Sequence, residues 1–237
     1  MKIAIFGDSF ADDIMHKEQG YDTWVEILRK KYYPDLVCYG TCGSSLYYSY
    51  NLLKKHYQDY DKIIFIATGP GRMSLPDYIE EPKHPFLFSR LRHFAGIRNI
   101  ELTLKESDKF NFSPVVIQAL EAAVMYYKYL YDDNKEQIMH KLLIEDISRT
   151  LPDVLFLDSQ QLVNISKYEI QACGLSFPYL NENFFDRRRC HLTKRNNEIL
   201  AEKMHQWIEG TPISLLTTDF EAHAREEIER LFGMEKK

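Results

Sequence analysis

The first residues suited to chemistry lie in the turn that follows a short apolar stretch at the N-terminus. Residues 2–6 are rich in isoleucine and end at Gly7, a pattern typical of a buried strand in a parallel sheet. Ligands of open α/β sheets bind beyond the carboxyl ends of the strands, so Asp8, Ser9 and Phe10 are expected where chemistry is done. A serine in this place could also serve only as a helix cap.

A histidine near the other end of the chain is suited to act with this serine. His191 stands two residues before Thr193, which is expected to cap a helix. A serine attacks an ester carbonyl when a base takes its proton and donors hold the developing oxyanion. The strand before Ser9 and the helix after His191 would bring both residues to one edge of the sheet. The alternative is a surface histidine near a helix start.

Two segments resemble the first and last blocks of the SGNH (GDSL-type) hydrolase family. The Gly-Asp-Ser-Phe turn resembles the first block, whose serine is the nucleophile, and residues 190–201 resemble the last, in which a histidine precedes a capped helix. The resemblance implies an esterase in which Ser9 attacks and His191 takes the proton. It also implies that the backbone N–H groups of Ser9 and Gly43 bind the oxyanion, with Gly40 a weaker match than Gly43.

Two positions depart from the pattern of this family. Its third block places an asparagine donor after the third strand, whereas this chain has Gly71 there, followed by Arg72. Removing such a donor typically costs about 10²–10³ in rate, so Arg72 or a loop residue replaces it, or the enzyme is slow or inactive. The family's aspartate would fall at Arg188. The nearest acid is Asp186, which can orient the histidine only if the loop bulges.

Charged residues near these blocks raise the question of an anionic ligand. Arginine binds carboxylate or phosphate through paired N–H groups, so residues 187–189 could recognise an anionic substrate, although a solvated loop is the simpler interpretation. The long loop could contribute further arginines, which are Arg90, Arg92 and Arg98.

Acidic residues close to Ser9 suggest a metal or phosphoryl-acceptor site as a rival hypothesis. Asp8, Asp12 and Asp13 would need a further carboxylate at the end of the third strand, but that strand ends at Thr68. The chain also lacks the glycine-rich phosphate-binding motif. We therefore expect no metal and no cofactor. The residues assigned to oxyanion or substrate binding are Asp8, Gly43, Gly71 and Arg72.

The order of apolar segments predicts the fold that positions these residues. Short apolar runs alternate with segments of helical periodicity, which implies right-handed crossovers between parallel strands. We expect a flavodoxin-like three-layer α/β/α sandwich with a mostly parallel, doubly wound sheet. The predicted strands are 2–6, 36–39, 62–68 and 153–157, and the predicted helices include 21–33, 46–57, 114–131, 134–150 and the segment after Thr193.

The length of 237 residues favours one domain with a small extension. We expect an SGNH-hydrolase-like domain over residues 1–210, interrupted by a long loop over 70–112 that has no sustained periodicity. Residues 211–237 are expected to add a C-terminal helix, because residues 218–221 form a capping box before an apolar face. That face either packs on the domain or mediates self-association.

Composition and charge exclude some classes of binding partner and indicate a cellular location. The formal net charge of −5 provides no global positive field for nucleic acid or an anionic membrane. The chain has no apolar run of transmembrane length and no signal-peptide pattern, and its four cysteines form no metal or disulfide framework, so we expect a cytoplasmic location.

The predicted function is cleavage of an O-acyl ester, such as an acetyl group on a carbohydrate, by Ser9 and His191. Two alternatives remain open at this point. One is an acyltransferase that uses the same serine and histidine. The other is a non-catalytic binding or structural module, which the missing asparagine and the displaced aspartate would suit.

Overall fold

The structure is a computed structural model and describes most of the elements predicted above. The described residues are 1–12, 21–74, 93–94, 97–105, 107–110, 112–151, 153–158, 169–170, 192, 194–213, 215 and 219–220.

The centre of the molecule is a parallel sheet of five strands in the order β2-β1-β3-β6-β7. This is the flavodoxin order, and the chain direction across the sheet reverses at β1, so the gap beyond the ends of β1 and β3 is where ligands of such sheets bind. The predicted fold class is confirmed. The strands are β1 (Ile3–Gly7), β2 (Val37–Gly40), β3 (Lys62–Ala67), β6 (Leu155–Asp158) and β7 (Glu169–Ile170).

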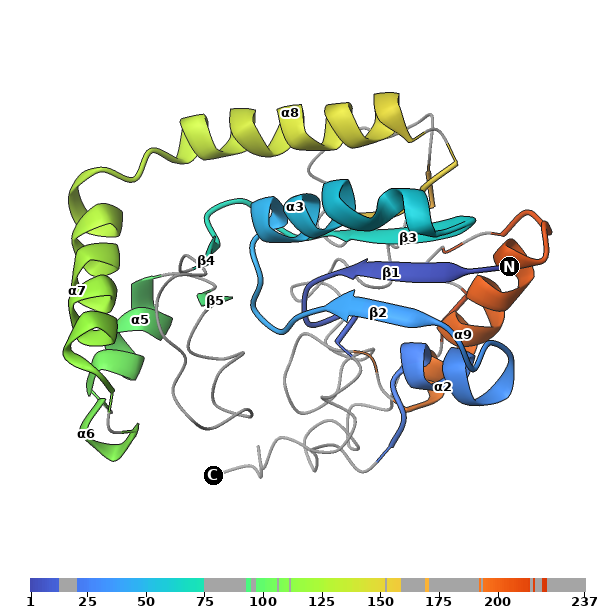
Figure 1. Cartoon of the computed structure of the whole chain (residues 1–237), viewed down its shortest axis with the longest axis horizontal. Coiled ribbons are helices and arrows are strands. Elements are labelled where there is room, and N and C mark those ends of the chain that lie inside the picture. Colours follow the sequence, from blue (N-terminus) through green and yellow to red (C-terminus); the bar gives the residue numbers. More distant parts are fainter. Residues whose placement is uncertain are drawn as a thin grey trace, which may run out of the picture.

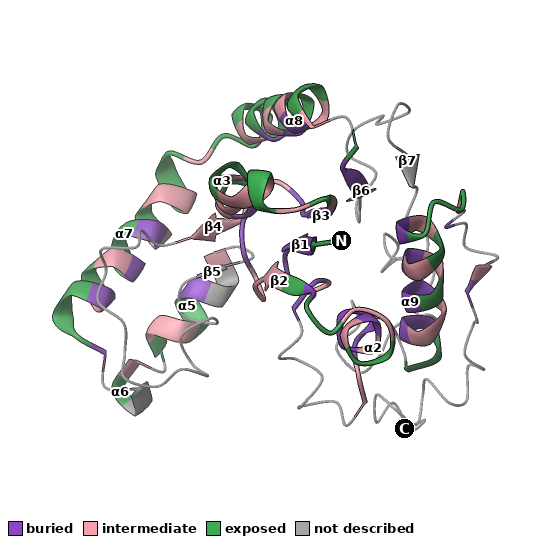
Figure 2. Cartoon of the chain, turned by 45° about the vertical axis from the view of Figure 1, so that its right-hand side comes forward, coloured by how far each residue is buried: buried purple, intermediate pink, exposed green. Residues whose placement is uncertain are grey.

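Helices cover both faces of the sheet (Figures 1 and 2), with α2 and α9 on one face and α3 and α8 on the other. The alternation of side chains along β1 explains the two cores: Ile3 and Ile5 pack with α2 and α9, whereas Ala4 and Phe6 pack with α3 and α8. The bounds are α2 (Trp24–Lys31), α3 (Leu46–His56), followed by the short η1 (Tyr57–Asp59), α8 (Asp133–Thr150) and α9 (Lys194–Ile208).

A third hydrophobic cluster lies outside these two cores and belongs to elements that extend to one side of the sheet (Figure 1). We call β4, β5, α5, α6 and α7 the cap unit. Part of the predicted long loop over 70–112 is therefore helical, since α5 and α6 both lie within it. The bounds are β4 (Met73–Ser74), β5 (His93–Phe94), α5 (Ile97–Lys105), α6 (Ser107–Phe110) and α7 (Pro114–Tyr129).

Polar side chains cap the first turns of four helices. These caps fix where the preceding loops end. Each of these residues accepts a hydrogen bond from a backbone N–H of the first turn, as N-caps do. They are Thr23 before α2, Ser45 before α3, Ser113 before α7 and Asp132 before α8.

Described residues after α9 pack against the sheet. Leu215 and Phe220 are buried in the same core as α9, and Asp219 pairs with Lys203 at 3.5 Å. The predicted helix beyond Phe220 lies outside the described residues. Within the part of the chain that the structure describes, no helix has both the length and the apolar character needed to cross a membrane.

Candidate functional site

The turn after β1 is held by its own aspartate. The carbonyl oxygen of Asp8 accepts the N–H groups of Ala11 and Asp12 at 3.0 and 3.1 Å, and its Oδ1 accepts the N–H of Phe10 at 3.0 Å. Ser9 lies inside this closed turn and is half-buried. The turn therefore fixes the backbone of the serine and leaves its side chain within reach of solvent.

Asp8 also ties the ends of two neighbouring strands together. Its carboxylate is fully buried, and Oδ2 accepts Thr68 Oγ1 at 2.8 Å and lies 2.9 Å from Arg72 Nη1. Burying a carboxylate is costly unless hydrogen bonds and an opposite charge compensate it, and here both are present. Thr68 and Arg72 follow β3, so this network lies at the point where the strand order reverses. Asp8 acts here as a framework residue.

The loop after β2 is clamped onto the end of β1. The carbonyl oxygen of Gly7 accepts the N–H of Thr41 at 3.1 Å and also lies within hydrogen-bond distance of two hydroxyls, Ser44 Oγ at 3.1 Å and Ser49 Oγ at 3.3 Å. Both serines are fully buried. The second loop is thus fixed against the turn that carries the candidate nucleophile.

Asp12 and Gly40 make further contacts between the same two loops. Asp12 is buried, and its Oδ2 accepts the N–H of Cys42 at 2.8 Å. A Cβ at residue 40 would lie 2.5 Å from the backbone carbon of Ala11, so only glycine permits this approach. From the sequence, Asp12 was considered only for a metal or phosphoryl-acceptor site, and Gly40 as a weaker oxyanion donor than Gly43. The structure gives both a role in positioning Gly43.

At this junction two backbone donors have no acceptor in the part of the chain that the structure describes. Gly43 has φ +78°, a left-handed conformation that glycine adopts without strain, and it is half-buried. Among the described residues, neither the N–H of Gly43 nor the N–H of Ser9 has a hydrogen-bond acceptor, and Ser9 Oγ also has no partner. The site therefore offers a free hydroxyl and two unused N–H groups on fixed loops.

Gly71 occupies the position at which the family resemblance implies an asparagine. Its φ is +78°, and a Cβ there would lie 2.5 Å from the hydroxyl oxygen of Tyr131. Tyr127 donates its hydroxyl to the carbonyl oxygen of Gly71 over 2.5 Å. Burial raises the pKa of Tyr131 to about 12, so its hydroxyl stays protonated at neutral pH. An asparagine at residue 71 would require Tyr131 to move.

Sequence patterns did not mark these two tyrosines, or His140, as part of the site. His140 in α8 is buried, and its Nε2 contacts the carbonyl oxygen of Thr68, which assigns the ring proton to Nε2. Helical spacing shows which side chains share one face of a helix, but it does not show which loop they reach. A cavity of about 220 Å³ lies here, lined by residues 45–47 at the start of α3, residues 69–72, and the α8 residues Lys135, Glu136, Met139, His140 and Leu143.

His191 and Asp186 lie outside the described residues, but the neighbouring Leu192 is tied to the candidate site. Its carbonyl oxygen accepts Asn197 Nδ2 at 3.0 Å, and Asn197 Oδ1 accepts the N–H of Trp24 at 2.9 Å. The indole N–H of Trp24 in turn donates to the carbonyl oxygen of Phe10 over 2.6 Å. Three hydrogen bonds thus link Leu192 to the turn that carries Ser9.

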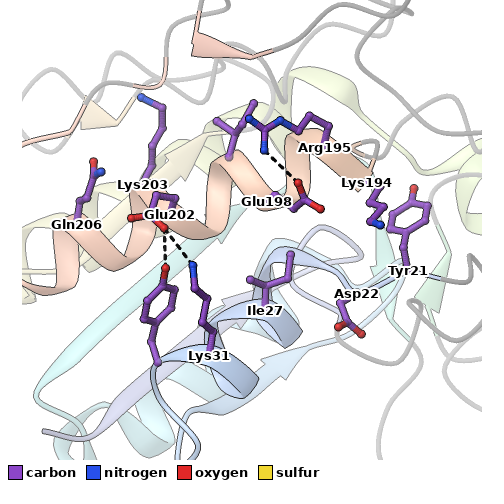
Figure 3. A pocket seen from close by; sticks show the side chains of 12 residues that line it. Tyr21, Asp22, Ile27, Lys31, Lys194, Arg195, Glu198, Glu202, Lys203 and Gln206 are labelled. Atoms are coloured by element: carbon purple, nitrogen blue, oxygen red, sulfur yellow. Dashed lines mark hydrogen bonds and ion pairs between the residues drawn. The ribbon is translucent and has the colours of Figure 1, made fainter.

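A larger cavity of about 820 Å³ lies between α2 and α9 (Figure 3). Tyr21 and Lys194 mark one end, where the hydroxyl of Tyr21 donates to the carbonyl oxygen of Leu192 over 3.1 Å. More than half of the residues that line it carry a charge, and both signs are present. Tyr32 in the lining donates its hydroxyl to Glu202 over 2.6 Å. The charged residues are Asp22, Lys31, Lys194, Arg195, Glu198, Glu202 and Lys203.

Comparisons with known proteins give little beyond this geometry. No family model matches the sequence, and no curated protein sequence matches it. Among solved structures, the chain is similar to an acetyl xylan esterase, AlAXEase, with a TM-score of 0.33 and 14% sequence identity over 88% of this chain and 100% of that one. The function proposed below therefore rests on the residues of this chain.

Proposed function

We propose that the protein is a serine hydrolase of the SGNH type that cleaves an O-acyl ester. The observation that carries this proposal is the pairing of the unbonded Ser9 hydroxyl with the unused N–H groups of Ser9 and Gly43, in the part of the chain that the structure describes. A nucleophile needs freedom to attack, and an oxyanion needs donors that no protein acceptor already occupies. A serine that served only as a helix cap would have its Oγ bonded to a backbone N–H.

The proposed reaction proceeds through an acyl-enzyme. Ser9 Oγ attacks the ester carbonyl while His191 takes its proton, and the oxyanion accepts the N–H groups of Ser9 and Gly43. Collapse of the tetrahedral intermediate breaks the bond to the alcohol, which receives the proton from His191. Water then attacks the acyl group, gives its proton to His191 and releases the acid, and that proton returns to Ser9. Asp186 is proposed to orient His191.

Arg72 is proposed to supply the donor that glycine at residue 71 cannot. One of its nitrogens is paired with Asp8, and in the described part of the chain its other guanidinium N–H groups have no partner. Its side chain is 17% exposed, so its charge is only partly screened by water. A permanently charged group in this position opposes the charge of the oxyanion.

The cavity between α2 and α9 supports a carbohydrate as the alcohol part of the ester. Its lining combines two tyrosines with charged groups that donate and accept hydrogen bonds, and hydroxyl-rich ligands require such partners. We therefore propose an ester on a saccharide, such as an acetyl ester, as the substrate.

The test is active-site labelling with a fluorophosphonate, followed by mapping of the adduct. We expect an adduct on Ser9 only, no adduct in Ser9→Ala, and a strong loss of labelling in His191→Ala. His56→Ala, a change at the far end of α3, is the matched control and should label like the wild type. Absence of any adduct in the folded wild-type protein would favour the non-catalytic binding module. Hydrolysis of an aryl acetate, compared with transfer to an added sugar, separates the hydrolase from the acyltransferase.

A further inference from the structure

The cap unit contacts the residues on both sides of Arg72. Met73, the residue after Arg72, packs against the hydrophobic cluster of the cap unit. Gly71, the residue before it, receives the 2.5 Å hydrogen bond from Tyr127. The ring of Tyr127 belongs to the same cluster, so one tyrosine connects the core of the cap unit to the backbone of the 69–72 loop.

Tyr131 lies against the same loop at Gly71. Its hydroxyl oxygen lies 2.5 Å from the place a Cβ at residue 71 would take, and it also donates to Asp133 over 3.2 Å. The rings of Tyr127 and Tyr131 are 5.3 Å apart at 32°, so each restricts the other. The Gly71 backbone therefore has little room to shift while both hydroxyls stay in place.

From these contacts we propose that Tyr127 and Tyr131 are positioning residues that hold Arg72 on Asp8, and so couple the cap unit to the site of ester cleavage. The proposal rests on the function proposed above. A guanidinium that must meet both Asp8 and an oxyanion needs a fixed backbone, because small displacements weaken such donors strongly. Tyr127 acts on the reaction only through the loop and Arg72.

The variant Tyr127→Phe removes the hydroxyl and keeps the ring. We expect kcat on an aryl acetate to fall about five- to tenfold with KM unchanged, since about one hydrogen bond is lost and it acts on the transition state. Tyr131→Phe should give a smaller loss of the same kind. The matched control is Tyr126→Phe, because Tyr126 lies in the same helix but donates to Glu136, so kcat should stay within twofold.

A double-mutant cycle distinguishes positioning from general support of the fold. If Tyr127 acts through Arg72, Tyr127→Phe should cost nothing further in an Arg72→Ala background. Additive losses in the double variant, or an unchanged kcat in Tyr127→Phe, would overturn the proposal.

A measurement that needs no activity separates this proposal from the proposed function. In ¹⁵N NMR spectra, the Nε–H signal of Arg72, assigned by its loss in Arg72→Lys, should exchange slowly with water in the wild type. It should exchange several-fold faster in Tyr127→Phe but not in Tyr126→Phe. A wild-type protein without esterase activity that shows this pattern would refute the function and keep the positioning role. Equal exchange in all three proteins would refute the positioning role.

Discussion

Arg72 Nη1 lies 2.9 Å from Oδ2 of Asp8, so a cation from the loop after β3 meets a fully buried carboxylate in the turn that carries Ser9. Removing one partner of such a pair leaves the other charge without compensation, which typically costs about 3–5 kcal/mol. Thr68 shares the same carboxylate oxygen and would retain one hydrogen bond. This relationship makes Arg72 both a part of the framework and a candidate donor.

Substitutions of Arg72 test its place in the oxyanion site. We expect Arg72→Ala to lower kcat and kcat/KM together by about 10² on a neutral ester, because the interaction is made in the transition state. Arg72→Lys should lose less, since it keeps the charge but not the paired N–H geometry. Steady-state kinetics on a neutral and an anionic ester, with urea unfolding to confirm that each variant is folded, make the comparison. An effect on KM limited to the anionic ester would reassign Arg72 to substrate recognition.

His191 and Asp186 are expected to differ in importance. His191→Ala should lose most of the activity, because it removes the group proposed to take the proton from Ser9. Asp186→Ala should lose less, since its spacing from the histidine departs from the family pattern and its part would be orientation only. The measurement is kcat for both variants on the same aryl acetate. Equal losses would show that the loop brings Asp186 onto the histidine.

Gly71→Ala should destabilise the protein more than Gly210→Ala. Both glycines have φ near +80°. Both substitutions therefore place a side chain in the left-handed conformation, which costs about 1–2 kcal/mol. Only at Gly71 would the added Cβ meet a neighbour, the hydroxyl of Tyr131 at 2.5 Å, whereas nothing lies within 4 Å at Gly210. The measurement is the free energy of unfolding in urea. The extra cost at residue 71 should shrink in a Tyr131→Phe background, and identical costs at the two sites would contradict the crowding.

A cluster between α3 and α8 predicts acid-sensitive stability. The hydrogen bond from Tyr50, with further help from Lys54 and Arg149, lowers the pKa of Asp146 below its ordinary value. A carboxyl whose pKa is lower in the folded state stabilises the protein above its unfolded pKa of about 4, and this contribution is lost as the pH falls further.

Tyr50→Phe should therefore reduce the free energy of unfolding at pH 7 and flatten its loss between pH 5 and pH 2. Tyr47→Phe is the control, because Tyr47 lies on the same helix with its side chain exposed. Urea unfolding at a series of pH values gives the comparison. A Tyr50→Phe curve parallel to that of the wild type would exclude this source of the acid sensitivity.

Local sequence patterns were sufficient to predict the framework. Strand and helix periodicity located β1, β2, β3 and β6 and the main helices to within a few residues, and the alternation of the two implied the parallel sheet. The placement of Ser9 after β1 followed from the same pattern, because the carboxyl ends of parallel strands face the ligand side. These features depend on neighbours a few residues apart, which a single sequence displays directly.

The contacts that complete the site were decided only by the tertiary structure. Thr68 reaches Asp8 across 60 residues of chain, Tyr127 reaches Gly71 across 56, and Cys42 reaches Asp12 across 30. No periodicity records such pairs, because each depends on where two separately formed loops or helices come to lie. The sequence showed Gly71 as a missing donor, whereas the structure shows it as the one residue type that fits beneath Tyr131 without displacing its hydroxyl. The physical reason is that these contacts depend on side-chain packing between distant elements, and such packing leaves no local pattern in the sequence.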